Sequence, residues 1–297
     1  NMTITLTREK ALTLQTACTS LLNTASPTIR EVARVLGKMV SSFPGVTYGA
    51  LHYRHLEYDD NRWNFDRRMS LSASAKLKLE WWIANVMTAE NVMTRDQPSC
   101  ELMTDASNNG WGAVCGQQST GGLWASDEKP HHINYLELLA VFLGLKALCS
   151  SHRDGHIRLK IDNTTAVAVI NHVGTSHSGH LNELCKEIWD WCIARNLWIS
   201  AGHIAGKANV EADLESRKNQ TRTEWMLNTT LFSQSLKTLQ FAPDIDLFAS
   251  RLNKQLPNYV AYRPDPESIA IDAFTINWAK LKFYAFPPFS VIAAVLK

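Results

Sequence analysis

Four carboxylates in the middle of the chain stand where predicted secondary-structure elements begin or end. They are Asp105, Glu137, Asp162 and Asp213. Asp105 and Asp162 each close a short strand-like run. Glu137 lies in the first turn of a predicted helix, and Asp213 lies where the last helix of this region opens. His203 ends the strand that precedes this last helix, which makes it a fifth candidate for chemistry.

Acids that end two adjacent strands lie side by side at one edge of a sheet. Carboxylates held that close repel one another unless a cation lies between them. A ligand set made only of oxygen suits Mg²⁺ or Mn²⁺. Two such ions can clamp an in-line phosphoryl displacement, so the expected reaction is phosphodiester hydrolysis. Taken singly, each Asp is more simply explained as a turn or cap residue, and Glu137 as a helix acid that interacts with the helix dipole. The metal-site hypothesis depends on the four acids occurring together in this order and spacing.

The elements that must position these acids follow the order β-β-β-α-β-α-α-β-α. Strands are expected at residues 100–105, 112–116, 123–126, 157–162 and 197–204, and helices at residues 134–149, 164–172, 179–195 and 208–216. Residues 117–122 are rich in Gly, Ser and Gln and are expected to form a turn. This order predicts an α/β fold with a mixed sheet and helices on its faces.

The flanking regions have a different character. Thr28 and Glu31 form a capping-box pattern before a helix in the mainly helical first hundred residues, and a second helix is expected at residues 72–93. Residues 218–222 form a polar joint, followed by a predicted amphipathic helix at residues 225–239 and a tail with several Pro-containing turns. Both ends of the chain are expected to be internal to a longer polypeptide.

Composition excludes several classes of protein. Formal net charge is +2 from 30 basic and 28 acidic residues, which does not by itself announce a nucleic-acid binder. We find no secretory signal and no apolar run long enough to cross a membrane.

The six cysteines are scattered without a CxxC pair. They are interpreted as buried free thiols in a reducing, intracellular compartment rather than as disulfides or zinc ligands. The pairs His131/His132 and His152/His156 lack a second ligand pair at zinc-site spacing and are interpreted as surface or packing residues.

Residues 100–217 resemble ribonuclease H. The resemblance is carried by Thr-Asp-Ala-Ser at 104–107, Gly-Trp-Gly-Ala-Val at 110–114, Glu-Leu-Leu-Ala at 137–140, Ile-Asp-Asn-Thr-Thr-Ala-Val at 161–167 and the run from His203 to Asp213. All four acids of the family's D-E-D-D set are present. The resemblance implies an RNase H-like, mixed five-stranded sheet flanked by helices. It also implies two-metal hydrolysis of the RNA strand of RNA–DNA hybrids, with two Mg²⁺ ions or Mn²⁺ in their place.

The family resemblance also implies residue roles. Asp105 would bridge both metals, and Glu137 would hold the second metal and orient substrate. Asp162 and Asp213 would complete the first-metal side, and His203 would assist metal exchange or product release. The candidates for contact with the hybrid's backbone or 2′-hydroxyls are Ser107, Asn108, Asn109 and Asn163. For the asparagines, a turn or cap role is an equally good interpretation.

The flanks resemble DIRS-type retrotransposon polyproteins. The similar segments are residues 28–45, 48–56 and 71–83 before the nuclease, and residues 244–251, 264–266 and 285–289 after it. This implies a mainly helical, thumb/connection-like segment at 1–97, an RNase H-like domain at 98–217 and a small α+β C-terminal extension at 218–297. The implied partners are an RNA–DNA hybrid and the reverse transcriptase palm of the same polyprotein, with no membrane.

Several features depart from the family. The loop at residues 172–180 has no Lys or Arg, which resembles the retroviral arrangement and predicts weak hybrid binding by this chain alone. Glu215 replaces another residue type and is expected either to face solvent or to perturb the metal site. Tyr58-Asp59-Asp60 lacks the context of a polymerase hairpin and is expected to be a polar loop. Residues 286–289, Phe-Pro-Pro-Phe, resemble a degenerate adenine-methyltransferase motif and are expected to be structural.

A second function stays open. The chain could be an RNase H-fold binding or assembly module, catalytically weak or inactive and recruited by a host, that acts through a partner. The aromatic flanks could serve such a partner surface, although core packing is the simpler use; they include Trp63, Trp81, Trp82 and Trp225. A DEDD-type exonuclease is disfavoured because Ser107 stands where that family needs Glu.

Overall fold

The computed structural model describes residues 2–53, 64–175, 178–218 and 225–297. The predicted loop at Tyr58–Asp60, Trp63, two residues of the 172–180 loop and most of the polar joint at 218–222 lie outside the described residues. The chain forms two compact units. One unit joins Asn1–Gln97 with Ala168–Ala194, and the other joins Pro98–Val167 with Arg195–Lys297. The predicted division at residues 97 and 217 stays a prediction.

The first unit is mainly helical. Its elements are β1 Thr3–Thr5, α1 Arg8–Asn23, α2 Ile29–Val40, η1 Phe43–Gly45, η2 Gly49–His52, α4 Ala73–Asn85, β2 Glu90–Val92 and α7 Gly179–Ile193. The capping box at the start of α2 is confirmed, with the Thr28 amide donating to Glu31 Oε2 at 2.7 Å. Trp82 is fully buried in the core of this unit, as expected for core packing, and its Nε1 donates to the His52 carbonyl at 2.9 Å.

The helix predicted over residues 72–93 is too long. α4 ends at Asn85, and β2 then pairs antiparallel with β1, Thr3 opposite Val92. A three-residue strand is too short to leave a clear alternating pattern in the sequence. α6, Thr164–Asn171, crosses the boundary between the two units.

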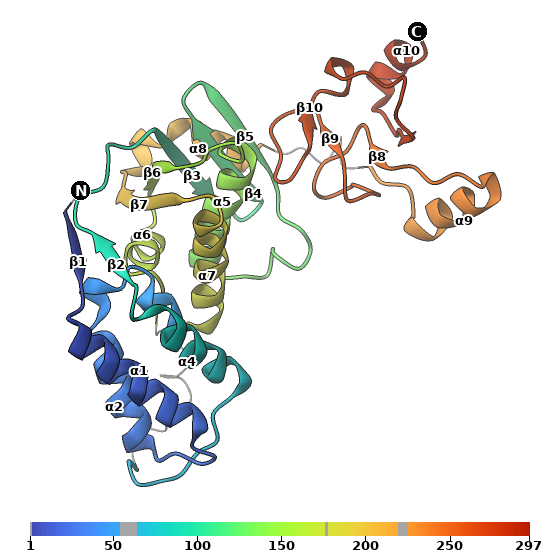
Figure 1. Ribbon diagram of the computed structural model, residues 1–297. Coiled ribbons are helices and arrows are strands. Elements are labelled where there is room, and N and C mark those ends of the chain that lie inside the picture. Colours follow the sequence, from blue (N-terminus) through green and yellow to red (C-terminus); the bar gives the residue numbers. More distant parts are fainter. Residues whose placement is uncertain (1, 54–63, 176–177, 219–224) are drawn as a thin grey trace. The chain divides into compact units, whose positions relative to one another are not determined.

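The second unit contains the predicted mixed five-stranded sheet (Figure 1). Its strands are β3 Cys100–Ala106, β4 Gly110–Cys115, β5 Gln118–Leu123, β6 Gly155–Ile161 and β7 Leu197–His203. The strand order is β5-β4-β3-β6-β7, antiparallel from β5 to β3 and parallel from β3 to β7. The α/β RNase H-like sheet expected from the sequence is therefore confirmed.

Two helices of this unit cover opposite faces of the sheet. α5, Ile133–Leu148, approaches so closely that a Cβ added at Gly144 would lie 2.9 Å from the Ala113 side chain. α8, Val210–Arg217, lies close to Gly112, the residue before Ala113 on β4: a Cβ added at Gly112 would lie 2.1 Å from the Ala212 carbonyl oxygen. Successive residues of a strand point to opposite faces, so α5 and α8 lie on different sides of β4.

The third strand was predicted at the wrong residues. The polar run expected to form a turn is β5 itself, and only Leu123 of the predicted strand 123–126 belongs to it. Cys115 pairs with Gln118, so the true turn is the two residues between them, and Gly116 supplies the positive φ of 61° that such a hairpin needs. A run of Gly, Ser and Thr residues is typical of a loop, but here it forms the edge strand β5.

The C-terminal extension contains α9 and several short strands. They are α9 Thr229–Leu239, β8 Ile245–Asp246, β9 Val260–Ala261, β10 Ala270–Ile271 and β11 Phe283–Tyr284, with η4 Ala273–Thr275, η5 Phe289–Val291 and α10 Ile292–Val295. The helix predicted from residue 225 begins only at Thr229, capped by Asn228, and Trp225 is exposed rather than packed in a core. β8 pairs in parallel with β11, and β9 with β10.

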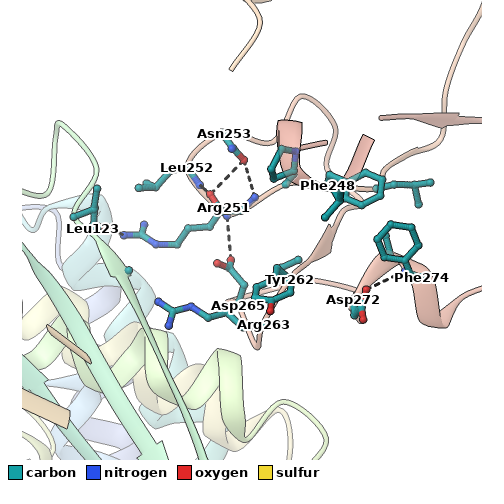
Figure 2. A pocket seen from close by; sticks show the side chains of 18 of the residues that line it. Leu123, Phe248, Arg251, Leu252, Asn253, Tyr262, Arg263, Asp265, Asp272 and Phe274 are labelled. Atoms are coloured by element: carbon teal, nitrogen blue, oxygen red, sulfur yellow. Dashed lines mark hydrogen bonds between the residues drawn. The ribbon is translucent and has the colours of Figure 1, made fainter. Parts of the chain in front are cut away.

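Ion pairs join this extension to β5 and to its surroundings. Arg251 contacts both carboxylate oxygens of Glu128, at 2.9 and 2.8 Å, and donates to the Leu123 carbonyl at 2.8 Å. Arg251, Arg263 and Leu123 are among the residues that line a cavity of about 460 Å³. Figure 2 shows these three side chains. Pro288 of the methyltransferase-like motif also lines this cavity.

Glu215 does not face solvent as one expectation had it. It is buried, and Arg263 Nη1 donates to its Oε2 at 3.0 Å while Lys218 pairs with its Oε1. Burial opposes ionisation, but these two cations lower the pKa of Glu215 overall. The residue that departs from the family pattern therefore anchors the C-terminal extension.

Among the residues that the structure describes, none of the helices is both long and apolar enough to cross a membrane.

Candidate metal centre

The parallel pairing of β3 and β6 sets the first two acids side by side. Thr104 is the partner of Ile161 in the register, so Asp105 and Asp162 are the next residues along two adjacent parallel strands. Both strands run toward the same edge of the sheet. Asp105 is the last residue but one of β3, and Asp162 directly follows β6. The sequence predicts this placement of Asp105 and Asp162 at one edge of the sheet.

Glu137 reaches the same edge from α5. The side-chain oxygens of Asp105, Glu137 and Asp162 include one atom from each that all lie within 4.8 Å of one another. Glu137 is not in the first turn of its helix, contrary to expectation, because α5 begins at Ile133 after its cap His132. Its position one turn inside the helix weakens the alternative that it serves the helix dipole, which acts mainly within the first turn.

Burial makes this cluster electrostatically unfavourable when no cation is bound. Asp105 is 5% exposed and Glu137 is 4% exposed. Desolvation, followed by the charges of Asp162 and Asp105, raises the pKa of Glu137 to about 9. Desolvation also raises the pKa of Asp105, and the nearby charges of Asp162 and Asp213 add to this effect. Both shifts are typical of carboxylates that share a site.

One side-chain oxygen of Glu137 lacks a hydrogen-bond partner in the described part of the chain. Glu137 Oε2 is buried and accepts no hydrogen bond from any residue that the structure describes. An unsatisfied acceptor of this kind costs about 1–3 kcal/mol unless a ligand or ion fills the role. A bound cation would satisfy it.

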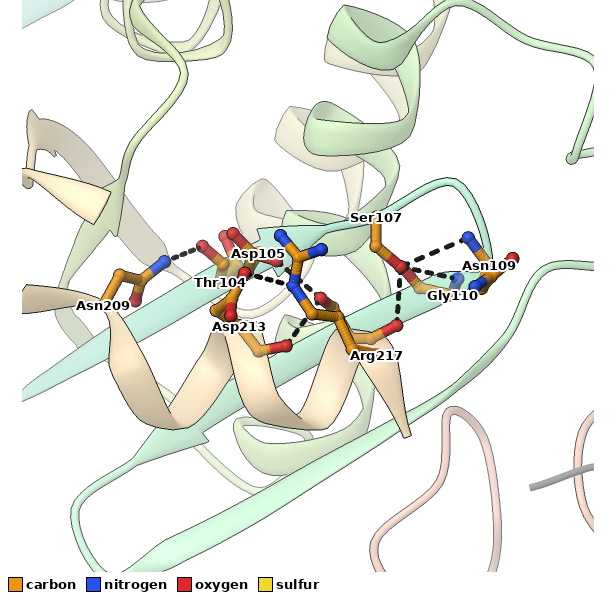
Figure 3. A network of polar contacts seen from close by, with 9 residues as sticks. Thr104, Asp105, Ser107, Asn109, Gly110, Asn209, Asp213 and Arg217 are labelled. Carbon is orange, nitrogen blue, oxygen red and sulfur yellow. Dashed lines mark hydrogen bonds and ion pairs between the residues drawn. The ribbon is translucent and has the colours of Figure 1, made fainter. Parts of the chain in front are cut away.

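Asp213 lies near the cluster but is already paired. Its Oδ1 accepts from Arg217 Nε at 2.6 Å, one helical turn along α8, and it is not one of the three acids that converge. Figure 3 shows Arg217 lying against Asp213 beside Asp105. Asp213 acts on the cluster through its charge, since it raises the pKa of Asp105.

Two buried residues that the sequence argument missed hold α8 against the acids. Ser216 Oγ donates to Asp105 Oδ2 at 2.6 Å, and Asn209 Nδ2 donates to the Thr104 carbonyl at 2.9 Å, as Figure 3 shows for Asn209. Asn209 belongs to the closing run from His203 to Asp213, and Ser216 follows that run by three residues. Their spacing from Asp213, at four residues before and three after, is the helical spacing of one face and was the available signal.

The other candidates occupy different places around the site. His203 ends β7 opposite Ile161 and is exposed. Ser107 is buried, and its hydroxyl donates to the Ser216 carbonyl at 2.7 Å. Asn108 is exposed. Asn163 Oδ1 accepts from the Ala166 amide at 2.9 Å.

These contacts give some candidates a structural role. Asn163 caps α6, because the Ala166 amide that it binds lies in the first turn of that helix. Ser107 closes the β3–β4 turn, where its hydroxyl also accepts from the Asn109 and Gly110 amides at 3.2 Å. Contact with substrate stays a prediction for Ser107, Asn108, Asn109 and Asn163, as do the assigned roles of the acids and of His203.

The residues present fit a divalent cation. The converging ligands are all carboxylates, which suit Mg²⁺ and Mn²⁺, and an unpartnered buried oxygen stands among them. The raised pKa values of Asp105 and Glu137 are the expected sign of a site that a positive charge would stabilise. Asp105, Glu137 and Asp162 therefore form an acidic cluster whose ligand atoms could hold a divalent cation.

Comparison with known proteins finds similar solved structures. RNase H1 from the halophilic archaeon Halobacterium salinarum NRC-1 is 19% identical, with 39% of this chain and 92% of that chain covered and a TM-score of 0.32. A foamy viral protease-reverse transcriptase dRH in complex with ds DNA is 14% identical over 67% of this chain and 35% of that chain, with a TM-score of 0.27.

A foamy viral protease-reverse transcriptase in complex with RNA/DNA hybrid is 13% identical over 66% of this chain, with a TM-score of 0.27. The match spans 27% of that viral chain. No family model and no curated protein matches the chain. The five-stranded sheet of the second unit has the strand order and register of an RNase H-like fold.

Proposed function

We propose that this chain is a ribonuclease H that hydrolyses the RNA strand of RNA–DNA hybrids. The observation that carries the proposal is the convergence of Asp105, Glu137 and Asp162, with one Glu137 oxygen buried and unpartnered among the described residues. A structural carboxylate cluster would be expected to have its oxygens satisfied by donors. This cluster instead lacks the positive charge that divalent cations would bring.

In the proposed reaction a water oxygen bonds to phosphorus, the bond from phosphorus to the leaving ribose oxygen breaks, and that oxygen takes up a proton. Two bound cations would supply water activation and neutralisation of the leaving oxygen. Asp105 would contact both cations, with Glu137 on the second side and Asp162 and Asp213 on the first. Ser216 would hold Asp105 in place, and His203 at the exposed end of β7 would assist product release.

We further propose a DIRS-type retrotransposon origin, on the sequence resemblance of the flanks. On this basis residues 1–97 form a thumb/connection-like segment, residues 98–217 the nuclease and residues 218–297 the extension. The partner would be a reverse transcriptase palm of the same polyprotein, which delivers the hybrid during reverse transcription. The near-neutral net charge supports dependence on that tether, because phosphate neutralisation supplies much of nucleic-acid affinity.

The test is cleavage of a labelled RNA–DNA hybrid in Mg²⁺ and in Mn²⁺, beside duplex RNA and duplex DNA. Asp162→Asn removes one cluster carboxylate and is expected to abolish cleavage of the RNA strand. Asp127→Asn, at an exposed turn of the same unit, is the matched control and should cleave normally. Cleavage that survives in Asp162→Asn would rule out this site.

A binding or assembly module is the second candidate, and the Arg217–Asp213 pair favours it. An arginine already neutralises the fourth acid, so one ligand of the expected set is engaged. This hypothesis predicts hybrid binding without cleavage in either metal. Hybrid retention in a gel-shift assay by a folded, uncleaving protein would place this hypothesis ahead of the nuclease.

A further inference from the structure

Three cysteines that are far apart in sequence meet at the other end of the same sheet. Cys100 is the first residue of β3, Cys115 is the last residue of β4, and Cys149 caps the C-terminus of α5. Their sulfur atoms all lie within 4.8 Å of one another. Asp105 lies toward the opposite end of β3, so this sulfur cluster is separate from the acids.

His152 adds a nitrogen beside the cluster. It follows Cys149 by three residues, and its amide donates to the Cys149 carbonyl at 3.1 Å, which folds the chain back over the end of α5. Its Nδ1 is buried and has no hydrogen-bond partner among the described residues. A buried ring nitrogen without a partner needs an explanation, and a metal ligand is one of the few that satisfies it.

The sulfur atoms already interact as a group. The Cys100 and Cys149 thiols both lie within hydrogen-bonding reach of the Cys115 sulfur. Two or more thiolates can form this close together only if a cation compensates their repulsion.

The geometry matches one class of cation. Zinc bound by thiolates at about 2.3 Å in a tetrahedron places sulfur atoms roughly 3.8 Å apart. A group of three sulfurs within 4.8 Å needs only a small contraction to reach that spacing. His152 is not one of the residues whose ligand atoms already converge within 4.8 Å, so its ring would have to move toward the sulfurs. With it, a Cys-x₂-His segment at 149–152 and two cysteines from neighbouring strands would supply four ligands, which is the closed arrangement of structural zinc.

We propose that Cys100, Cys115, Cys149 and His152 form a structural zinc site that ties β3, β4 and the end of α5 together. With four protein ligands the ion has no open position, so it stabilises the sheet rather than catalysing a reaction. The site does not depend on the proposed nuclease. It also revises the interpretation of these cysteines as scattered buried thiols, since Cys100 and Cys115 are only half-buried and three of the six cluster.

The first test measures zinc in the purified full-length chain by elemental mass spectrometry. About one zinc per chain is expected, with most of it lost in Cys149→Ser. Cys192→Ser removes a buried cysteine of α7 outside the cluster and should retain the zinc. Zinc retained equally by Cys149→Ser, or an adventitious ion only, would overturn the proposal.

The second test begins with the unaltered protein, so its main result does not depend on a variant that folds. Cobalt exchanged into the site should give visible bands of tetrahedral cobalt and sulfur-to-cobalt charge-transfer bands in the near ultraviolet. His152→Asn should shift the visible bands and weaken cobalt binding while leaving the sulfur bands. Three freely alkylated thiols in unreduced protein, or a disulfide between two of the three, would refute the site. Neither result bears on hybrid cleavage in magnesium, which is assayed separately.

Discussion

Glu137 combines burial, a neighbouring pair of acids and an oxygen without a partner in the described chain. In solution a glutamate is ionised at neutral pH, but here the pKa is raised to about 9. The metal-free protein therefore holds this side chain protonated at pH 7, and metal binding must displace that proton. Proton release on addition of Mg²⁺ is the direct consequence.

Glu137→Gln is expected to stabilise the metal-free protein at pH 8. A raised folded-state pKa contributes stability that is fully present below the unfolded value, 4.5, and is lost as pH rises toward about 9. The wild-type Tm without added metal should therefore fall between pH 5 and pH 9 more steeply than the Tm of Glu137→Gln. At the upper end of this range the free energies of unfolding of the two proteins should differ by an amount on the order of a few kcal/mol. Thermal unfolding across that pH range checks this, and parallel curves for the two proteins would contradict it.

Ser216→Ala is expected to weaken the site without removing a ligand. The hydroxyl donates to Asp105 at 2.6 Å and lowers the pKa of that acid, so its loss should raise the pKa further. The magnesium concentration for half-maximal cleavage should rise, most strongly at low pH where protons compete. Stability should fall by about 1–2 kcal/mol.

The control for Ser216→Ala is Ser119→Ala, which removes a hydroxyl bound to Glu215 on β5. It should leave the magnesium requirement unchanged. Equal magnesium requirements for Ser216→Ala and wild type would show that Ser216 does not support Asp105.

At the scale of elements, the close approach of α8 to β4 decides whether the closing segment can reach the acids. Gly112 pairs with Asp105 across the ladder, and α8 lies directly over it. Only a residue without a side chain allows this contact. The same contact brings Ser216 within hydrogen-bond distance of Asp105.

Gly112→Ala is therefore expected to displace α8 and to abolish most hybrid cleavage. The added Cβ would lie 2.1 Å from the Ala212 carbonyl, which is backbone and cannot swing aside. Gly37→Ala in α2 is the matched control, since nothing lies within 4 Å of its added Cβ, and it should stabilise the chain by up to about 1 kcal/mol. Circular dichroism and the cleavage assay, applied to both variants, measure the outcome; wild-type cleavage by Gly112→Ala would refute the argument.

Elements with a clear apolar pattern were predicted correctly from the sequence, whereas a strand made of polar residues was missed. The positions of Asp105 and Asp162 followed from the ends of two apolar runs, and parallel pairing brought them together. β5 was missed because its Gly, Ser and Thr residues resemble a turn. The Cys100, Cys115 and Cys149 cluster was missed because three separate elements bring it together, which no local spacing records.

At the scale of the whole chain, charged pairs hold the C-terminal extension to the rest of the second unit. Arg251 and Glu128 are 13% and 18% exposed, so their pair is shielded from water more than a surface pair would be. Lys146 and Glu267 form a second link at 2.6 Å, and Arg263 with Glu215 a third. Removing one partner of a shielded pair leaves the other charge uncompensated.

Arg251→Ala is expected to loosen the extension, at a cost of about 2–3 kcal/mol, because it leaves Glu128 without its bidentate partner. Hydrogen–deuterium exchange should speed up at residues 118–123. Lys186→Ala removes an exposed pair with Asp190 on α7 and should leave exchange at β5 unchanged. Unaltered exchange at β5 in Arg251→Ala would mean that the extension does not depend on this contact.

The contacts at β5 also bear on how the protein behaves in a crowded solution. β5 is the last strand of its sheet, and an exposed last strand is a template on which other chains can add and aggregate. The extension supplies Arg251 to the carbonyl of Leu123 and Arg263 to that of Gly121, and it receives a hydrogen bond from Thr120 at the Pro264 carbonyl. The residues after 217 thus protect this edge strand from pairing with other chains. A chain ending at residue 217 would be expected to be less soluble and more prone to aggregate.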